Sequence, residues 1–241
     1  QVVRAALADG HEVTAIVRST GSAQLDGVDV RQVRAGLEDV QRLRSALKGV
    51  EGLVHCAAVY AFGADLAAEV GRVNVEGTRA VIEAAASAGV GRVVVTTSSV
   101  TCGSSESPSA RDESAHPGQE PSSAYFASKV AQEEVAVTGG EAYGIPVVLA
   151  LPTVVLGGPF GRLAPSTGIV LRYPLDATHS TYPGGCNVVD VRDVARGHLL
   201  LLERGEAGQR YLLGGQDLTW RMLHTLVADL AGLPGPYAEV P

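Results

Sequence analysis

Short β-branched runs alternate with longer helical segments along the first 153 residues. The apolar runs fall at residues 11–18, 51–58, 91–99 and 145–153. A segment with helical spacing precedes each of them, at residues 1–10, 37–49, 70–88 and 125–143. This alternation is typical of a parallel sheet with helices packed on both faces. We therefore predict an α/β fold with a doubly wound parallel sheet.

The pattern changes near residue 155. Residues 157–185 are rich in turn formers and show no regular period, so we expect irregular structure there. A helix at residues 191–203, a strand at 209–215 and a helix from Thr219 follow. We predict a sheet domain at residues 1–154 and a smaller C-terminal lobe at residues 155–241, interleaved with the sheet.

Composition excludes several classes of protein. The net charge is −7 and 46% of the residues are hydrophobic, which argues against a nucleic-acid binder and allows a sizeable core. Three widely spaced cysteines fit neither a disulfide framework nor a zinc site, so we expect no metal and a reducing, cytoplasmic location. We find no apolar run long enough to span a membrane, and we predict no membrane partner.

The segment Tyr125-Phe-Ala-Ser-Lys129 stands out because the chain contains 17 arginines and only two lysines, Lys48 and Lys129. On a helix, residues four apart share a face. A lysine beside a phenol lowers the phenol's pKa, so that a tyrosine can exchange a proton with a carbonyl or alcohol oxygen. The alternative interpretation is a chance pair on an exposed helix face.

Hydroxyl side chains follow the predicted strand at residues 91–99. Thr97, Ser98 and Ser99 would lie at the carboxyl edge of the sheet, where ligands bind in open α/β folds. A serine there can hydrogen-bond a substrate oxygen and stabilise developing charge. Serine and threonine also cap loops, and this remains the alternative.

Two further segments point to a nucleotide. Small residues follow His55, so a flat ligand could approach the backbone there, while His55 itself reads as structural. Arg18 ends the strand at residues 11–18, where dinucleotide folds carry an acid for the ribose or an arginine for a 2′-phosphate. Arg18 therefore favours NADP(H) over NAD(H). The alternative is that Arg18 is a solvated surface residue, in which case NAD(H) remains the possible cofactor.

The chain resembles the extended short-chain dehydrogenase/reductases, the NAD-dependent epimerase/dehydratase family, and within it the dihydroflavonol-reductase-like branch. The segments that carry the resemblance are HCAA, VNVEGTRAVIEAA, VVVTTSSV, YFASK, LALPTVVLGGP, NVVDVRDVARGHLLLLERG and RYLLGG, in family order. It implies a Rossmann-type dinucleotide-binding domain at residues 1–154 and a substrate-binding lobe at residues 155–241.

The resemblance also implies roles for individual residues. Tyr125 would be the acid/base and Lys129 its partner, and Ser99 would hold the substrate oxygen, with Ser98 in its place if the alignment shifts by one. The cofactor-binding residues implied, besides Tyr125 and Lys129, are Arg18, Leu37, Cys56, Ala57, Ala58, Asn74, Thr97, Pro152 and Thr153. Subunits would pair as a homodimer through the helices at residues 70–88 and 125–143.

The sequence departs from the family in several places. The glycine-rich loop that cradles the pyrophosphate is absent, and since the chain starts with Gln1 we expect that loop upstream. The acid usual before the Leu37 segment is replaced, which affects one adenine contact. Val154 stands where sugar-nucleotide enzymes often carry an asparagine, and the Thr-Asp-Glu signature of sugar dehydratases is missing around Ser98. These two differences disfavour a nucleotide-sugar substrate.

We therefore predict an NADP(H)-dependent oxidoreductase that reduces a small-molecule ketone or aldehyde through Ser99, Tyr125 and Lys129. One alternative is an epimerase that uses the same site with tightly held NAD. The other is a cofactor-sensing binding protein without turnover, which the intact Tyr125–Lys129 pair disfavours, since a sensor needs no acid/base.

Overall fold

The computed structural model describes residues 1–19, 23–105, 109–118, 123–158 and 164–240. The helices are α1 (Val2–Ala8), α2 (Val40–Ala46), α3 (Ala67–Gly71), α4 (Gly77–Ala88), α5 (Ala124–Tyr143), α6 (Pro165–Leu175), α7 (Val191–Arg204) and α8 (Trp220–Ala231). The strands are β1 (Thr14–Val17), β2 (Arg31–Arg34), β3 (Gly52–His55), β4 (Arg92–Thr96), β5 (Val147–Pro152), β6 (Val154–Leu156), β7 (Ser180–Thr181), β8 (Gly185–Asp190), β9 (Arg210–Leu213), β10 (Gln216–Thr219) and β11 (Ala238–Glu239).

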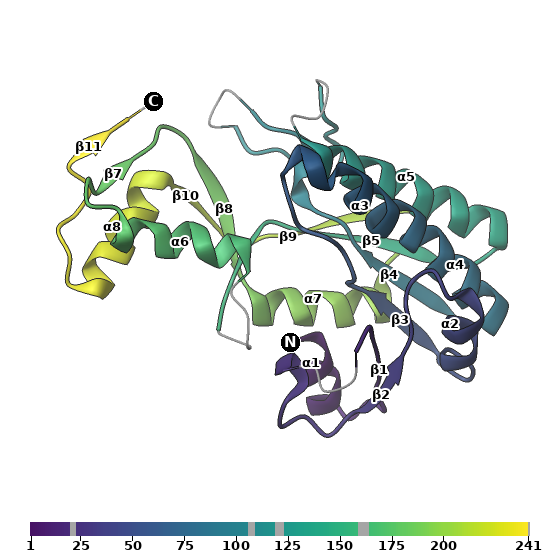
Figure 1. Ribbon diagram of the computed structural model, residues 1–241. Coiled ribbons are helices and arrows are strands. Elements are labelled where there is room, and N and C mark those ends of the chain that lie inside the picture. The colour runs from purple at the N-terminus through teal and green to yellow at the C-terminus, as the bar shows by residue number, and fades with distance from the viewer. Residues whose placement is uncertain (20–22, 106–108, 119–122, 159–163, 241) are drawn as a thin grey trace.

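The larger part of the molecule is built on parallel strands. One sheet has the order β3-β4-β5-β9, with every neighbouring pair parallel, and β1 pairs in parallel with β2 in a separate sheet. Helices lie on both faces of the four-stranded sheet, α4 and α5 on one and α7 on the other (Figure 1). The predicted α/β fold with a parallel sheet is confirmed.

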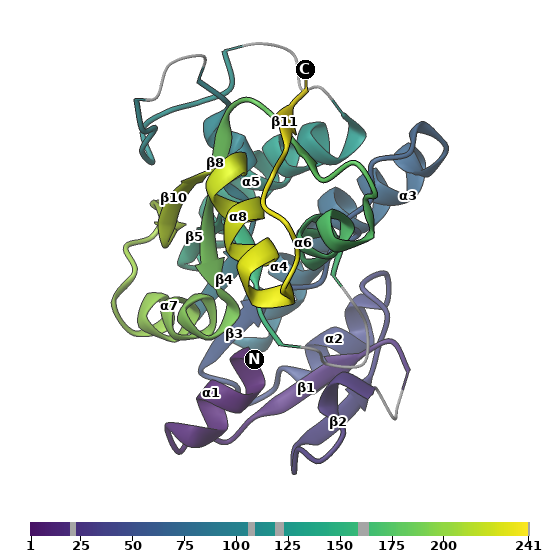
Figure 2. The ribbon, with the colours of Figure 1, turned by 90° about the vertical axis from the view of Figure 1, so that its left-hand side faces the viewer.

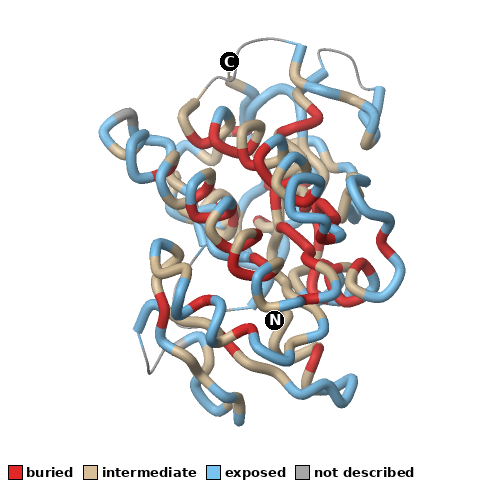
Figure 3. The backbone as a smooth tube through the Cα atoms, turned by 90° about the vertical axis from the view of Figure 1, so that its right-hand side faces the viewer, coloured by how far each residue is buried: buried red, intermediate tan, exposed pale blue. Residues whose placement is uncertain are grey.

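Alternation along β4 and β5 explains the two-sided packing. Val93 and Val95 belong to the core cluster that includes α4 and α5 residues, whereas Val94 packs with Val148 and Leu201 of α7. Side chains alternate across a strand, so a continuous valine run supplies both faces. In Figure 3 the buried stretches of the backbone, in red, concentrate toward the middle of the molecule, with exposed segments around them.

The helix predicted at residues 70–88 is confirmed, but it is not regular throughout. It runs from α3 through a π-helical turn at Arg72–Glu76 into α4, and it ends at Gly89 with φ of 77°. Left-handed backbone of this kind favours glycine, as in the usual helix C-cap. π-Helical turns are rare and often occur at functional sites.

The C-terminal lobe consists of a three-stranded sheet, β10-β8-β6, and the helices α6 and α8, with β7 and β11 at its far end (Figure 1). Figure 2 views the molecule from that end, with α8 in front of the larger sheet. The helix α7 and the strand β9 return to the larger sheet, so the lobe is interleaved with it. In the described residues, no helix combines the length and apolar character needed to cross a bilayer.

The expectation of irregular structure at residues 157–185 was wrong where α6 forms. Gly168 and Pro174 lie inside this helix and hide its period, and packing against α8 holds it in place. The strand β2 was also missed, because its sequence, Arg-Gln-Val-Arg, has only one apolar residue.

Candidate active site

The predicted site residues gather where β3, β4 and β5 end. These strands are parallel and in register, with His55 opposite Val95 and Thr96 opposite Ala150, so their carboxyl ends share one edge. The segments that leave this edge are residues 56–60 and 97–102, and α5 begins beside them with Tyr125 in its first turn. This is the edge at which open α/β sheets bind ligands.

Tyr125 is held at the start of α5, where the Ser123 side chain accepts a hydrogen bond from the Phe126 N–H and caps the helix. The side chain is 7% exposed, and burial raises the pKa of Tyr125 to about 12, although a hydrogen bond with Ser98 opposes the shift. The phenol is therefore fully protonated at neutral pH in the absence of a ligand.

An aromatic cluster surrounds Tyr125. The ring centroids of Tyr60 and Phe62 lie 4.7 and 5.3 Å from that of Tyr125, and Phe126 lies 6.1 Å away. Tyr60 and Phe62 are exposed, whereas Tyr125 is buried. Exposed rings packed against a buried phenol form an apolar wall beside it.

Of the two serines, Ser98 is the one whose side chain interacts with the Tyr125 phenol, where it opposes the rise of the pKa of Tyr125 that burial causes. Ser98 has extended backbone and caps the 3₁₀-helix Ser99–Cys102, with its Oγ accepting from Val100 N–H at 3.4 Å. Ser99 is the first residue of that short helix. The two serines therefore lie on different backbone elements, a distinction that the sequence left open.

Lys129 lies one helical turn beyond Tyr125, with its Nζ 5.8 Å from the centre of the Tyr125 ring. The side chain is 2% exposed, and the ammonium donates to Thr96 O at 3.2 Å and to Gln132 Oε1 at 2.8 Å. Burial lowers the pKa of Lys129 to about 8, an effect that nearby Cys56 and Glu133 oppose. The predicted pair is thus brought together, with neutral acceptors on the ammonium.

Asn74 fixes the backbone that follows β3. Its side chain accepts from Val59 N–H at 2.7 Å, donates to Val59 O at 3.0 Å, and donates to Ser128 Oγ at 3.0 Å. It is fully buried in the π-helical turn. Asn74 therefore connects this segment to α5 and takes a supporting position rather than an exposed one.

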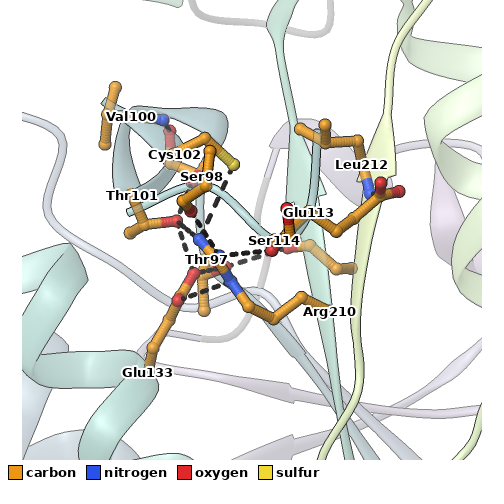
Figure 4. Close-up of polar contacts among 12 residues, drawn as sticks. Thr97, Ser98, Val100, Thr101, Cys102, Glu113, Ser114, Glu133, Arg210 and Leu212 are labelled. Carbon is orange, nitrogen blue, oxygen red and sulfur yellow. Dashed lines mark hydrogen bonds and ion pairs between the residues drawn. The ribbon is translucent and has the colours of Figure 1, made fainter. Parts of the chain in front are cut away.

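A second polar cluster adjoins the segment that carries Ser98 (Figure 4). Glu133 Oε1 accepts from the hydroxyls of Thr97 at 2.9 Å and Thr101 at 2.6 Å, and Glu133 Oε2 pairs with Arg210 Nε at 3.1 Å. Arg210 also donates to the backbone oxygens of Glu113 and Ala115, at 2.6 and 2.7 Å. The Glu133–Arg210 ion pair thus connects α5 and β9 to residues 97–101 and 113–115.

The predicted cofactor residues differ in exposure. Cys56, Ala57 and Ala58 are exposed at the end of β3, as a ligand-lining segment requires. Thr97 is buried and its hydroxyl is used by Glu133, and Pro152 is buried at the end of β5. Thr153 is half-buried and donates to Asn187 Oδ1 at 2.8 Å, so its hydroxyl contacts the C-terminal lobe.

Arg18 is exposed just after β1 and has a neighbour that sequence reasoning missed. Arg34 is exposed at the end of the parallel strand β2, and its Nε donates to Arg18 O at 3.2 Å. The missed signal was the second arginine of a short polar strand. Leu37 lies further on and packs against Gly77, where a Cβ atom would come within 2.6 Å of Leu37 Cδ1.

Metal-binding side chains do not cluster here: across the described ranges, no group of three or more His, Cys, Asp or Glu side chains is placed to hold an ion. What the site does bring together is a buried tyrosine and a buried lysine at the ligand edge of a parallel sheet, a pair that can exchange a proton with a bound oxygen.

Comparison with known proteins identifies the family. The profile of the NAD-dependent epimerase/dehydratase family matches residues 1–214, and the chain belongs to this family. It is an NAD(P)-dependent enzyme of the short-chain dehydrogenase/reductase type. The resemblance noted in the sequence is confirmed.

Individual relatives include both reductases and sugar-modifying enzymes. A putative dihydroflavonol 4-reductase from Synechocystis is 32% identical over all of this chain and 71% of its own length. Cinnamoyl-CoA reductase 1 from Oryza sativa is 36% identical, over 95% of this chain and 71% of its own. The structure of a dTDP-glucose 4,6-dehydratase from Streptomyces venezuelae, with NAD bound, matches with a TM-score of 0.81 at 29% identity, covering 99% of this chain and 80% of that one.

Proposed function

We propose that the protein is an NADPH-dependent reductase of an aromatic or other planar apolar ketone or aldehyde. The observation that carries the proposal is the buried Tyr125 beside the Ser98 side chain, with Lys129 one helical turn away. This set suits donation of a proton to a carbonyl oxygen, which is the task of the protein in such a reduction. Reductases among the relatives support the same direction.

The side chains have separate tasks in the proposed reaction. The nicotinamide supplies hydride chemistry when it is bound. Tyr125 donates its phenolic proton to the carbonyl oxygen as negative charge develops there. Ser98 hydrogen-bonds the same oxygen and steadies the charge. The Lys129 ammonium stabilises the tyrosinate that remains, because an adjacent cation favours the ionised phenol.

The residues at the sheet edge fit a dinucleotide. Ala57 and Ala58 have small exposed side chains that allow a flat ligand to approach the backbone after β3. Arg18 and Arg34 lie together at the ends of β1 and β2, where they would pair with a 2′-phosphate. A second arginine beside Arg18 supports the preference for NADPH that the sequence suggested, and NADH remains the alternative cofactor.

The substrate class follows from the aromatic cluster. Tyr60 and Phe62 are exposed and contact the ring of Tyr125, so a substrate whose carbonyl reaches the phenol also meets these rings. Aromatic pairs of this kind favour planar apolar ligands. A small-molecule carbonyl compound with an aromatic body therefore suits the site better than a charged sugar nucleotide.

One observation favours the alternative, an epimerase that holds NAD throughout the reaction. The solved relatives include sugar-nucleotide enzymes with NAD bound, at up to 29% identity. Such an enzyme would use the same Tyr125 and return the hydride to its substrate, with no net consumption of cofactor. Val154, in place of the asparagine expected in sugar-nucleotide enzymes, argues against it.

The experiment measures cofactor and turnover together on the full-length protein. We would titrate NADPH and NADH, and then follow NADPH oxidation with a panel of aromatic ketones and aldehydes. The proposal expects exchangeable NADPH, a clear preference over NADH, and consumption that depends on the carbonyl compound. NAD that survives dialysis, with no NADPH oxidation, would instead support the epimerase.

A further inference from the structure

Lys129 has an unusual set of neighbours for a buried cation. Its Nζ donates to Thr96 O and to the side-chain oxygen of Gln132, which are both neutral acceptors. A buried cation is usually paired with an anion or hydrogen-bonded by several partners, since burial strongly disfavours the charged form. The acceptor in this position is an amide, so the identity of residue 132 bears directly on the ammonium.

Gln132 is oriented by a chain of buried hydrogen bonds. It is fully buried, and its Nε2 donates to Thr78 Oγ1 at 2.9 Å. The Thr78 hydroxyl donates its single proton to Asn74 O at 2.7 Å. Thr78 Oγ1 is therefore an acceptor toward Gln132, and the amide oxygen of Gln132 must point to Lys129.

The single proton of Thr78 also determines the tautomer of His55, which lies at the other end of this hydrogen-bond chain. His55 Nε2 lies 3.0 Å from Thr78 Oγ1, whose proton is already used, so His55 must carry its proton on Nε2 and donate it. Burial lowers the pKa of His55 to about 4, with the charge on Lys129 as a second cause, so the ring is neutral at physiological pH. The chain from His55 through Thr78 to Gln132 thus has one direction and no net charge.

We propose that Gln132 is a positioning residue for Lys129: its amide oxygen, held by Thr78 and His55, fixes the ammonium beside Tyr125 without neutralising it. The proposal rests on the role of Tyr125 and Lys129 in the proposed function. A carboxylate in the same position would bond the ammonium equally well but cancel its charge, and the phenol would lose the cation that favours its ionised form.

Other charged and titratable groups face Lys129 and belong in the interpretation. From the end of β3 these are His55 and Cys56, and from α5 they are Tyr125 and Glu133. Glu133 is paired with Arg210, so its charge is already compensated. From β4 comes only the carbonyl of Thr96, which does not titrate. Gln132 is therefore the neighbour whose charge a single isosteric substitution can change.

The test uses the scarcity of lysine. With only Lys48 and Lys129 in the chain, protein labelled with ¹³C at the lysine Cε gives two signals. Lys48, which is exposed just after α2, can be replaced by arginine, and the signal that remains is then that of Lys129. The pH titration of the Lys129 signal is then compared among wild type, Gln132→Glu and Gln132→Leu. The titration needs no substrate.

The two variants have opposite expected effects. In Gln132→Glu the titration midpoint of Lys129 moves up by about one pH unit or more, since an adjacent carboxylate favours the ammonium. In Gln132→Leu it moves down by about one pH unit, because the charged form loses a hydrogen bond. A purely structural role for Gln132 would move both midpoints the same way or leave both unchanged, and either result would overturn the proposal.

A variant at the next residue of the hydrogen-bond chain, Thr78, tests the proposal if Gln132→Leu does not fold. Thr78→Val removes the acceptor that orients Gln132, and a smaller downward shift of the Lys129 midpoint is expected, whereas an unchanged midpoint would count against the proposal. Turnover adds a separate readout: kcat falls in Gln132→Glu while KM for the carbonyl compound stays nearly constant. If the midpoints shift as expected but no carbonyl compound is reduced, the proposed reaction fails and the positioning role of Gln132 stands.

Discussion

Two polar clusters meet at the carboxyl end of β4. One holds a cation among neutral acceptors, and the other holds a cation and an anion paired with each other. On one side, Lys129 is bonded to neutral acceptors, Gln132 and Thr96 O. On the other side, Glu133 is paired with Arg210 and is bonded by threonine hydroxyls. The residues Gln132 and Glu133 are neighbours on α5, yet they face different clusters.

This contrast separates the support of the site from its chemistry. A paired carboxylate and guanidinium satisfy each other and hold several backbone segments in place, so the cluster around Glu133 suits a structural task. An unpaired ammonium keeps its field available to a nearby phenol, so the cluster around Lys129 suits proton transfer. We therefore expect substitutions on the two sides to affect different quantities.

The largest effect is expected from Tyr125→Phe, which removes the proposed proton donor and keeps the ring. We expect kcat to fall by about 10³-fold, or about 4 kcal/mol in the activation barrier, with NADPH affinity nearly unchanged. The measurement is steady-state reduction of an aromatic carbonyl compound. The matched control is Tyr60→Phe, which removes a phenol from a ring packed on Tyr125 and should leave most of the turnover intact.

The charged cluster should respond in stability. Arg210→Met leaves the largely buried Glu133 carboxylate, with a side chain 12% exposed, without its partner, and we expect the free energy of unfolding to fall by about 2 to 3 kcal/mol. Chemical denaturation measures it. Adding Glu133→Gln should recover part of the loss, and no recovery would show that the ion pair is not the cause. Arg192→Met breaks an exposed pair with Asp190 and serves as the control, with little expected change.

The neutral cluster should respond to pH through His55. Its pKa is about 4 in the folded protein against 6.5 for the free side chain, so between these values the unfolded chain binds more protons than the native one. Stability is therefore lost as the pH falls from 6.5 to 4, by up to about 3 kcal/mol from this residue. Chemical denaturation at several pH values measures it: the free energy of unfolding should fall less steeply with falling pH in His55→Gln than in wild type. An equally steep fall in the variant would refute the assignment.

The smallest effect concerns the cofactor. Replacing both Arg18 and Arg34 by serine removes the positive pair at the ends of β1 and β2, and we expect the preference for NADPH over NADH to fall about tenfold. Fluorescence titration of both nucleotides measures it. Affinity for NADH should stay the same, because the pair is proposed to contact only the 2′-phosphate. Equal weakening of both nucleotides would contradict that role.

The sequence predicted the elements with a strong period and the contacts within them. Tyr125 and Lys129 were paired from their spacing alone, since a helix brings residues four apart together. The parallel sheet followed from its valine runs. By contrast, α6 carries Gly168 and Pro174 and depends on packing, so its local sequence did not reveal it.

The contacts of the site depend on tertiary structure that one sequence does not display. Gln132 is fixed by Thr78, 54 residues earlier, and Glu133 by Arg210, on a different strand. The choice between Ser98 and Ser99 depended on where β4 ends, and strand ends shift by one residue without any change of pattern. The signal for both clusters in the sequence was that Gln132 and Glu133 follow Lys129 closely on the same predicted helix, where polar side chains on a packed face need partners.

The most direct test of the central claim follows deuterium from NADPH labelled at C4 of the nicotinamide into an aromatic carbonyl compound. The account predicts one deuterium at the carbinol carbon of an alcohol product, stoichiometric NADP⁺, and almost no product from Tyr125→Phe. An alcohol formed equally by wild type and Tyr125→Phe, or an isomerised substrate with no NADP⁺, would contradict it.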